Sequence, residues 1–362
     1  MAGMRILRAM RPIRLTDDPP NAEASISDLD GGTVPNDRFY VRCNFPVPRL
    51  DAATWRLEVA GAFDGPRAWS LDDLQALPSV DRTITLECAG NGRTLMMPAP
   101  PGTPWGLGAV GTARFRGVRL TDLLAASGLR DNAVELVFTG ADRGTVEPEG
   151  NIAYEFNLDR DLAVDDGPIL AWAMGDEPLS AEHGFPLRLI VPGQYGMRSV
   201  KWLTRITAVE QPFIGHFPRK YRYRGERGVA DGEPVGAVRV RSLITFPRDG
   251  TRLPMAPIAL RGIAWSGRGP ITSVEVKAGG DRLQASIGDP IDGTGPATWT
   301  CDWTPPFAGS HRIAVRATDG SGHPQPEAPV WNEGGYGNNV VQAITVHVVD
   351  IAEQGLQPHG SG

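Results

Sequence analysis

One short segment combines residue types that could carry out metal or redox chemistry. Residues 86–93 read L-E-C-A-G-N-G-R, so Cys88 stands where an alternating stretch gives way to a glycine turn, with Arg93 shortly after it. A cysteine at a strand end is directed into a loop-lined cavity, and its thiolate is a soft metal ligand. A nearby guanidinium favours the thiolate and can hold a phosphate or oxyanion by two hydrogen bonds. The octapeptide alone fits a buried cysteine beside a surface arginine equally well.

The segments around this cysteine predict short strands and a few helices. Alternation over residues 82–88 predicts the strand that ends at the cysteine, and the glycines that follow predict a turn. A short helix is expected at 121–127, with Thr121 as N-cap and Gly128 as its left-handed end. Further strands are expected at residues 55–59, 134–139, 186–191 and 200–209. We therefore expect an α+β domain, preceded by an arm or irregular lead-in up to about Pro35.

After about Gly225 the pattern changes to short strands separated by turn residues. The expected strands are residues 237–246, 258–265, 271–278, 297–303, 311–317 and 340–349. Six or seven such strands over roughly 115 residues are typical of an immunoglobulin-like sandwich.

The composition excludes several classes of function. Thirty-six Lys and Arg against 42 Asp and Glu give a net charge of −6, so the surface as a whole would not attract nucleic acid or an anionic membrane. Cys43, Cys88 and Cys301 lie far apart without C-x-x-C spacing, which excludes a zinc site and c-type haem attachment. The sequence shows no signal peptide, paired-arginine signal or long apolar run. We expect a cytoplasmic protein, or a periplasmic one if a leader has been removed.

Several segments, in the same order along the chain, resemble motifs of the sulfite oxidase family. C-A-G-N-G-R at 88–93 resembles the family's molybdenum-cysteine motif, C-A-G-N-R-R in many members. F-Y-V-R followed by P-V-P at 39–48 resembles the substrate-arginine segment, and residues 105–120 resemble the stretch beyond the cysteine. H-G-F-P-L-R at 183–188, with V-P-G and V-K-W after it, is similar to the pterin-binding segment almost residue for residue.

The C-terminal part resembles the immunoglobulin-like dimerisation domain of the same family. A-W-S-G at 264–267 and P-V-W-N at 329–332 carry this likeness. The resemblance thus spans nearly the whole chain after the N-terminal lead-in.

The resemblance implies a role for each matching position. Cys88 would be the protein ligand of molybdenum, whose other ligands would be the two dithiolene sulfurs of molybdopterin and terminal oxygens. Arg42 and Arg93 would bind an anionic substrate, where the alternative for either is a surface salt bridge. Trp105 would line the substrate pocket, unless it simply packs in the core. The residues implied to hold the cofactor, besides the cysteine, are Asn44, His183, Arg188, Arg198 and Lys201.

Three positions depart from the family pattern or match it loosely. Where many members have R-N-H before P-V-P, this chain has R-C-N, so Asn44 replaces a histidine and cannot carry a proton charge. Gly92 replaces one arginine of C-A-G-N-R-R. For the active-site tyrosine the resemblance offers Tyr221 first and Tyr223 second. These departures bear on the substrate and the rate, and they leave the metal ligand intact.

The sequence therefore predicts an α+β molybdopterin-binding domain of the sulfite oxidase type followed by an all-β immunoglobulin-like sandwich. The expected parts are an N-terminal arm at 1–35, a catalytic domain at 36–225, a dimerisation domain at 226–352 and a tail at 353–362. The resemblance implies a molybdenum-molybdopterin enzyme without haem in this chain. It would oxidise sulfite to sulfate by oxygen-atom transfer, pass electrons to a separate acceptor such as a cytochrome, and form a homodimer.

Three alternatives remain at this point. The first is a reductase of the same cofactor class, acting on a sulfoxide or another small oxyanion; the related methionine-sulfoxide reductases lack the sandwich. The second is a binding protein of immunoglobulin-like type in which Cys88 is inert. The third, with Cys88 as nucleophile and His183 as base, is permitted by residue type, but no cysteine-hydrolase motif surrounds Cys88.

Overall fold

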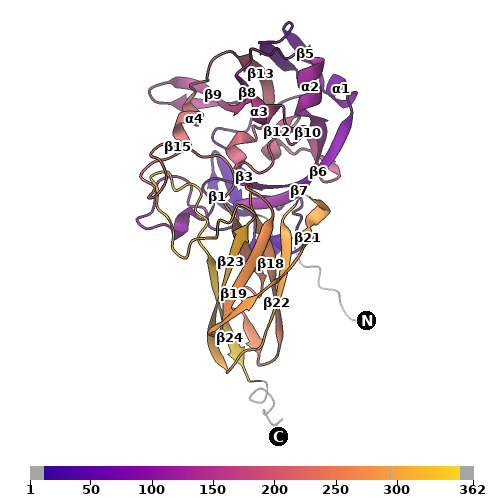
Figure 1. Cartoon of the computed structure of the whole chain (residues 1–362). Coiled ribbons are helices and arrows are strands. Elements are labelled where there is room, and N and C mark those ends of the chain that lie inside the picture. The colour runs from indigo at the N-terminus through magenta and orange to yellow at the C-terminus, as the bar shows by residue number, and fades with distance from the viewer. Residues whose placement is uncertain (1–11, 294, 351–362) are drawn as a thin grey trace, which may run out of the picture. The chain divides into compact units, whose positions relative to one another are not determined.

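The computed structural model describes residues 12–293 and 295–350, which fold into two compact units (Figure 1). The first unit comprises the described residues up to Asp28, then Thr33–Val238 and Val330–Asn338. The second comprises Leu29–Gly32, Arg239–Pro329 and the described residues from Asn339 onward. The expected tail at 353–362 and the first eleven residues of the expected arm lie outside the described part. The segment 330–338, which the sequence grouped with the sandwich, belongs to the first unit.

Two five-stranded sheets form the framework of the first unit. One has the order β5 (Arg67–Trp69), β4 (Leu57–Gly61), β13 (Leu203–Val209), β8 (Glu135–Val146) and β9 (Gly150–Asp159). The other contains β11 (Glu177–Pro178), β10 (Ile169–Met174), β7 (Val110–Arg119) and β6 (Ser79–Glu87), with β12 (Arg188–Ile190) also paired to β10. The helical elements of this unit are short: α1 (Leu71–Gln75), α2 (Leu120–Ala126), α3 (Arg160–Ala163), α4 (His216–Lys220), η2 (Arg93–Leu95), η3 (Ala181–His183) and η4 (Gly196–Arg198).

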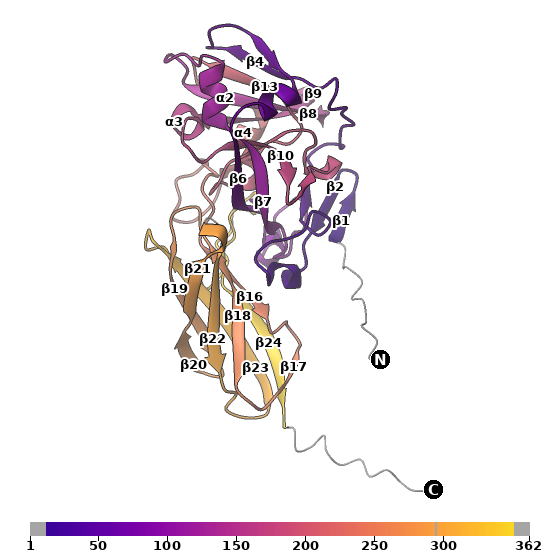
Figure 2. The same ribbon diagram turned by 90° about the vertical axis from the view of Figure 1, so that its right-hand side faces the viewer.

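The strand that leads to the cysteine is a long partner of β7. β6 pairs antiparallel with β7 from Ser79 opposite Val118 to Glu87 opposite Val110, and the two strands lie side by side in Figure 2. Ile84 and Leu86 are buried. The expected strand at 82–88 is thus confirmed, and Cys88 is the first residue beyond it.

The expected helix at 121–127 is present, but its cap was predicted wrongly. α2 begins at Leu120, and its N-cap is Arg119, whose side chain makes no capping hydrogen bond. Leu120 is fully buried, so packing of this apolar residue moves the helix start one position before the threonine. Gly128 has a φ of 70° and ends the helix in the left-handed conformation, as expected.

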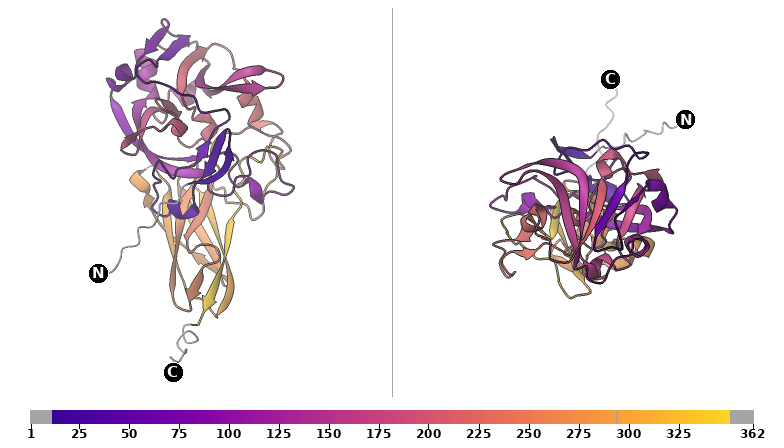
Figure 3. Two further views of the ribbon diagram at one scale, coloured as in Figure 1. Left: turned by 180° about the vertical axis from the view of Figure 1, so that it is seen from behind. Right: turned by 90° about the horizontal axis from the view of Figure 1, so that it is seen from above.

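The expected irregular lead-in contains a small sheet. β1 (Ile13–Asp17) and β2 (Pro20–Glu23) form a hairpin, and β2 pairs with β3 (Val41–Arg42), as the indigo strands of Figure 3 show. Asn21 and Ala22 are buried in it. The prolines and aspartates of the turn hide the strand pattern in the sequence, whereas the pairing with β3 stabilises it. A further two-stranded sheet of this unit joins β14 (Arg222–Tyr223) and β15 (Glu233–Pro234).

The second unit is a sandwich of two sheets. One has the order β16 (Arg241–Phe246), β18 (Ile258–Trp265), β22 (Ala297–Trp303) and β21 (Ser286–Pro290). The other has the order β17 (Arg252–Pro254), β24 (Gln342–Val349), β23 (Gly309–Asp319), β19 (Ile271–Ala278) and β20 (Asp281–Gln284). The short helices are η1 (Ile26–Leu29), which joins the two units in sequence, and η5 (Ile291–Gly293). Trp299 and Leu260 from one sheet and Val276 and Val346 from the other belong to one buried core. The predicted fold class, an α+β domain followed by an immunoglobulin-like sandwich, is confirmed.

Candidate active site

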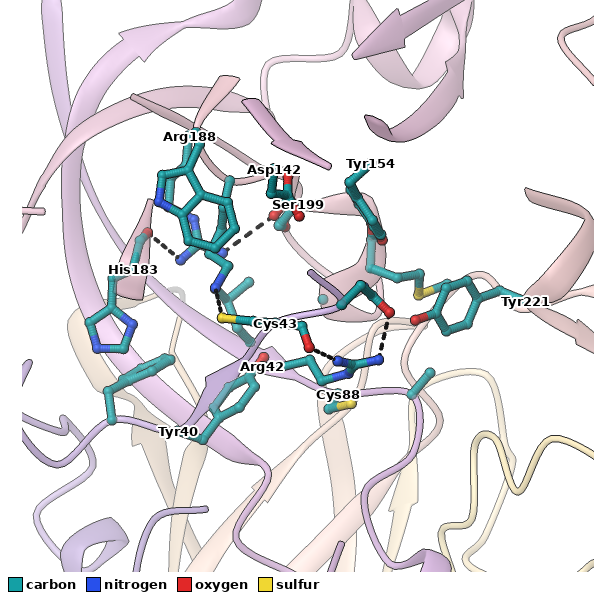
Figure 4. A pocket seen from close by; sticks show the side chains of 18 residues that line it. Tyr40, Arg42, Cys43, Cys88, Asp142, Tyr154, His183, Arg188, Ser199 and Tyr221 are labelled. Carbon is teal, nitrogen blue, oxygen red and sulfur yellow. Dashed lines mark hydrogen bonds between the residues drawn. The ribbon is translucent and has the colours of Figure 1, made fainter. Parts of the chain in front are cut away.

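A cavity in the first unit brings together residues from widely separated parts of the sequence (Figure 4). The cavity and its mouth hold about 680 Å³ of space, a size suited to a cofactor or a small organic ligand. The lining residues are Phe39, Tyr40, Arg42, Cys43, Asn44, Leu86, Cys88, Ala89, Asp142, Tyr154, His183, Arg188, Gly196, Met197, Ser199, Lys201, Trp202 and Tyr221. Seven of the residues predicted from the sequence are therefore in one place: Arg42, Asn44, Cys88, His183, Arg188, Lys201 and Tyr221.

Cys88 lies at the cavity because β6 ends one residue before it. Its backbone N–H donates to the carbonyl of Ala109 at 2.9 Å, and its own carbonyl accepts from the N–H of Asn91 at 2.9 Å. Asn91 closes the turn further, since its amide oxygen accepts from the N–H of Ala109 at 3.1 Å. The thiol is only half-buried and is directed to a cavity rather than into the core.

The turn after Cys88 is also held by residues from near the end of the chain. The N–H of Gly337 donates to the carbonyl of Ala89 at 2.8 Å. The side chain of Asn338 donates to the carbonyl of Gly92 at 2.7 Å. Gly92 has a φ of 80°, a conformation that favours glycine.

Arg42 presents a fixed positive charge to the cavity. Its guanidinium donates to the Asn44 side-chain oxygen at 2.6 Å, to the Asn21 side-chain oxygen at 3.2 Å and to the carbonyl of Cys43. Burial disfavours its charged form, but the acidic groups of Tyr221 and Cys88 outweigh burial and raise the pKa of Arg42. The arginine therefore stays charged, and its three hydrogen bonds fix the direction of the guanidinium.

His183 and Arg188 form a second, more deeply buried part of the wall. The Nε2 atom of His183 lies 2.9 Å from the carbonyl oxygen of Asn36, so Nε2 carries the proton and donates. Burial lowers the pKa of His183 to about 3, which makes the imidazole neutral. Arg188 donates to the carbonyls of His183 at 2.9 Å and Ser199 at 3.4 Å, and burial lowers its pKa to about 10. Its Nε has no hydrogen-bond partner among the described residues, which leaves a donor for a ligand.

Lys201 adds a third cation to the lining. Its Nζ donates to the carbonyl of Glu182 at 2.7 Å and to Sγ of Cys43 at 3.1 Å, the latter dashed in Figure 4. Nζ also lies 4.2 Å from the ring centre of Trp202. Three cationic side chains around one cavity create a local anion site in a chain whose net charge is negative.

The structure does not bring the other predicted residues to the cavity lining. Arg93 is buried and donates instead to the carbonyls of Thr103 at 2.6 Å and Gly334 at 3.0 Å. Trp105 is 1% exposed and packs in the core. The guanidinium of Arg198 lies 5.5 Å from the ring centre of Phe156. Of the two candidate tyrosines, Tyr221 lines the cavity and Tyr223, in β14, does not, which favours Tyr221 as the site residue.

The sequence reasoning missed five polar lining residues: Tyr40, Cys43, Asp142, Tyr154 and Ser199. Asp142 is 4% exposed, and its Oδ1 finds no hydrogen-bond partner in the described part of the chain. Burial raises its pKa to about 6, against the opposing effects of Lys201 and Arg42. The signal that could have revealed it is an acidic residue between two glycines, G-A-D-R-G at 140–144, where the pairing of β8 with β9 shifts register.

The donor set fits a metal held mainly by a cofactor. Within residues 12–293 and 295–350, no three His, Cys, Asp or Glu side chains gather into a group that could hold a metal ion. One half-buried thiol that faces the cavity beside arginine and lysine side chains fits a metal with one protein sulfur and an anionic organic ligand. Of the helices in those residues, none is long and apolar enough to cross a bilayer.

Comparison with known proteins defines the class to which this fold and site belong. A family described as oxidoreductase molybdopterin binding domain matches residues 44–217. The mitochondrial sulfite oxidase of Rattus norvegicus is 34% identical over 91% of this chain, and that of Homo sapiens is 35% identical over 91%. The chain spans 64% of the length of each, which is less than two thirds. These similarities support a molybdopterin-dependent oxidoreductase of the sulfite oxidase family, as the resemblance of its motifs predicted.

The chain is also similar to a nitrate reductase and to a solved structure of a sulfane dehydrogenase. NADH nitrate reductase 1 of Phaseolus vulgaris is 33% identical over 93% of this chain, which spans 42% of that protein. The crystal structure of the sulfane dehydrogenase SoxCD from Paracoccus pantotrophus matches 94% of this chain and 86% of its own chain, with a TM-score of 0.79 and 24% identity. The latter supports the fold. The matching family model and the sulfite oxidase relatives imply the predicted cofactor, molybdenum held by molybdopterin.

Proposed function

We propose that this protein is a molybdenum-dependent oxidoreductase that oxidises sulfite to sulfate and passes the electrons to an external acceptor. The observation that carries the proposal is the joint presence of the Cys88 thiol, the Arg42 guanidinium and the Tyr221 ring in one cavity. A thiol offers the metal ligand, and a fixed guanidinium offers a site for an anion.

The cofactor would be held by residues on both sides of the cavity. Cys88 would bind the metal, and the free donor of Arg188 together with Lys201 would attract the negative charge of the pterin and its phosphate. The neutral His183 would offer an acceptor at Nδ1, because its Nε2 proton is used by Asn36. When bound, this cofactor supplies two-electron oxygen-atom transfer, which protein side chains cannot perform.

The protein's own contribution to turnover is binding, orientation and charge. Arg42 would bind the oxyanion, and its three hydrogen bonds would keep the guanidinium from collapsing onto the thiol. Tyr221 is 7% exposed and would donate a hydrogen bond to a substrate oxygen while its ring helps to exclude water. Asn44, which replaces a histidine of many relatives, accepts from Arg42, so it positions the arginine without adding a titrating group.

The remaining assignments belong to the same proposal. Arg93, Trp105 and Arg198 would act outside the cavity, by supporting its walls rather than by touching the substrate. The acceptor would be a cytochrome or another electron carrier. The sandwich would form the interface of a homodimer, as the resemblance implies.

A reductase acting on a small oxyanion is a second candidate, because a nitrate reductase is nearly as similar as the sulfite oxidases. Both substrates are small oxygen anions, so the cationic lining alone fits either. The two reactions differ in the direction of electron flow. Assays of sulfite oxidation and nitrate reduction on the same preparation therefore distinguish the two candidate functions.

The test is an activity assay on protein with measured molybdenum content. We expect sulfite-dependent reduction of ferricyanide in proportion to bound molybdenum, and much slower nitrate-dependent oxidation of a reduced viologen dye. The matched variants are Cys88→Ser at the cavity and Cys301→Ser in the sandwich core; only the first should lose turnover. A molybdenum-loaded preparation that reduces nitrate and ignores sulfite would establish the second candidate instead.

A further inference from the structure

Cys43 and Lys201 form a close sulfur–nitrogen pair that the proposed function leaves unexplained. Sγ of Cys43 lies 3.1 Å from Nζ of Lys201, and both residues line the cavity. The chain holds 36 Lys and Arg, yet only three are lysines, Lys201, Lys220 and Lys277. Arginine serves nearly everywhere else as the cation, so an amine beside a thiol is a chemically distinct feature of this cavity.

Separate contacts hold Cys43 and the Nζ atom of Lys201 in place. The N–H of Cys43 donates to the Asn21 side-chain oxygen at 3.1 Å, and its carbonyl accepts from Arg42. Nζ of Lys201 is held by the carbonyl of Glu182 at 2.7 Å and faces the ring of Trp202. The pair therefore needs little rearrangement to come into bonding distance.

The surroundings favour a nucleophilic amine. Burial lowers the pKa of Lys201 and Arg188 lowers it further, while Cys43 and Asp142 raise it and offset part of this effect. Asp142 interacts electrostatically with Lys201, and its unpartnered Oδ1 offers an acceptor for the proton that the amine loses. A neutral amine attacks an electrophilic sulfur, whereas an ammonium does not.

We propose that Cys43 and Lys201 are an oxidant-dependent modification site at which a covalent sulfur–nitrogen bond forms. Hydrogen peroxide first oxidises the Cys43 thiol to a sulfenic acid: the O–O bond breaks, one oxygen stays on sulfur and the other leaves as water. The Lys201 amine then attacks that sulfur. The S–N bond forms, the S–O bond breaks, and the hydroxyl leaves with an amine proton as a second water. Sulfur loses two electrons and the peroxide gains them.

The bond would change the electrostatics of the cavity. It removes the Lys201 charge from a lining that otherwise holds Arg42, Arg188 and Lys201 as cations, and it joins the loop after β3 to the segment before β13. An oxidised chain would then bind an anionic cofactor less well. This consequence rests on the proposed function, whereas the bond itself does not.

The experiment is mass spectrometry of the full-length chain, purified both with molybdenum cofactor and from cells that cannot make it. After treatment with hydrogen peroxide, we expect a product lighter by two hydrogen atoms in at least one preparation. Digestion should yield the Cys43 and Lys201 peptides joined to each other, and dithiothreitol should separate them. Recovery of Cys43 and Lys201 unlinked in both preparations would overturn the proposal, and this result needs no variant.

Variants identify the partner of Cys43. Lys201→Arg should abolish the crosslink, while Lys220→Arg and Lys277→Arg should retain it. A Cys43–Cys88 disulfide would have the same mass change, so Cys88→Ser is needed to exclude it, and this variant should retain the crosslink. A product that requires Cys88 and not Lys201 contradicts the proposal. A crosslink in a chain that binds no molybdenum under any condition would support this modification and refute the proposed function. Failure of the modification and failure of the proposed function therefore give different results.

Discussion

The side-chain oxygen of Asn21 accepts a hydrogen bond from the guanidinium of Arg42 at 3.2 Å. The same oxygen accepts from the N–H of Cys43 at 3.1 Å. The amide nitrogen of Asn21 donates back into its own hairpin, to Thr16 Oγ1 at 2.7 Å and to the carbonyl of Pro19 at 3.0 Å. The N-terminal hairpin thus sets the direction of the charge that faces the cavity.

Asn21→Ala should therefore weaken substrate binding more than turnover. Loss of a buried hydrogen bond to a charged group costs about 1.5–3 kcal/mol, which corresponds to a rise in KM for sulfite of roughly tenfold or more. Steady-state kinetics with sulfite check this. Asn132→Ala is the control, because its side chain bonds Glu210 at the surface. An unchanged KM in Asn21→Ala would show that Arg42 does not need the hairpin.

Cys88→Ser should abolish turnover and lower the bound molybdenum, while the free energy of unfolding of the cofactor-free chain changes by less than about 1 kcal/mol. The small stability change follows because the side chain is half-buried and faces a cavity. Metal analysis, the sulfite assay and urea unfolding provide the three measurements. Near-normal turnover in this variant would reject Cys88 as the metal ligand.

Arg93→Met should destabilise the fold without affecting sulfite binding. It removes hydrogen bonds to Thr103 and Gly334, which at about 1.5–3 kcal/mol for a charged donor is a large share of domain stability. Arg42→Met should instead raise the KM for sulfite, because Arg42 lines the cavity. A rise in KM for Arg93→Met as large as that for Arg42→Met, in a fully folded protein, would restore Arg93 to the substrate site.

The neutral, buried His183 should make the cofactor-free chain less stable in acid. Burial lowers its pKa from 6.5 to about 3, so between these values the unfolded state binds the extra proton. The stabilisation is fully present above pH 6.5 and is lost as the pH falls, by on the order of 2–4 kcal/mol near pH 4. Urea unfolding at pH 7.5 and pH 4 should show a smaller difference in His183→Gln than in the unchanged chain. Equal differences would indicate that the imidazole titrates normally.

Asp142 should show the opposite pH dependence. Because its pKa is raised from 3.8 to about 6, the folded state binds the extra proton in that window, and stability falls as the pH rises through it. Asp142→Asn should therefore stabilise the cofactor-free chain by about 2–3 kcal/mol at pH 7.5 and have little effect at pH 4. Asp131→Asn, at a fully exposed carboxylate, is the control. A destabilised Asp142→Asn at pH 7.5 would mean that the carboxylate has an ion-pair partner.

Much of the fold could be predicted from patterns that depend on neighbouring residues alone. β18, β19 and β22 have the bounds expected from their alternation, because one face of each packs into the core of the sandwich. The position of Cys88 at a strand end could likewise be predicted from the alternation over residues 82–88. The hairpin β1–β2 was missed, because its stability comes from pairing with β3 rather than from its own sequence.

The candidate site could be predicted only where a motif fixes the backbone. Cys88, His183 and Arg188 follow or occupy regular elements, and all three reach the cavity. Arg93 follows a tight turn, and the direction of a long side chain after such a turn depends on which carbonyls lie nearby. Cys43 and Asp142 meet Lys201 across more than fifty residues of intervening sequence, a distance at which spacing carries no information.

The contacts of Gly337 and Asn338 with the turn after Cys88 bear on how the protein is made. During synthesis, the ribosome would have translated the cysteine long before these residues emerge from the exit tunnel. The metal-binding loop would therefore acquire its final shape only when translation is nearly complete. Insertion of the cofactor into this loop would then be a post-translational event, and a chain shortened before residue 330 would leave the loop unfinished.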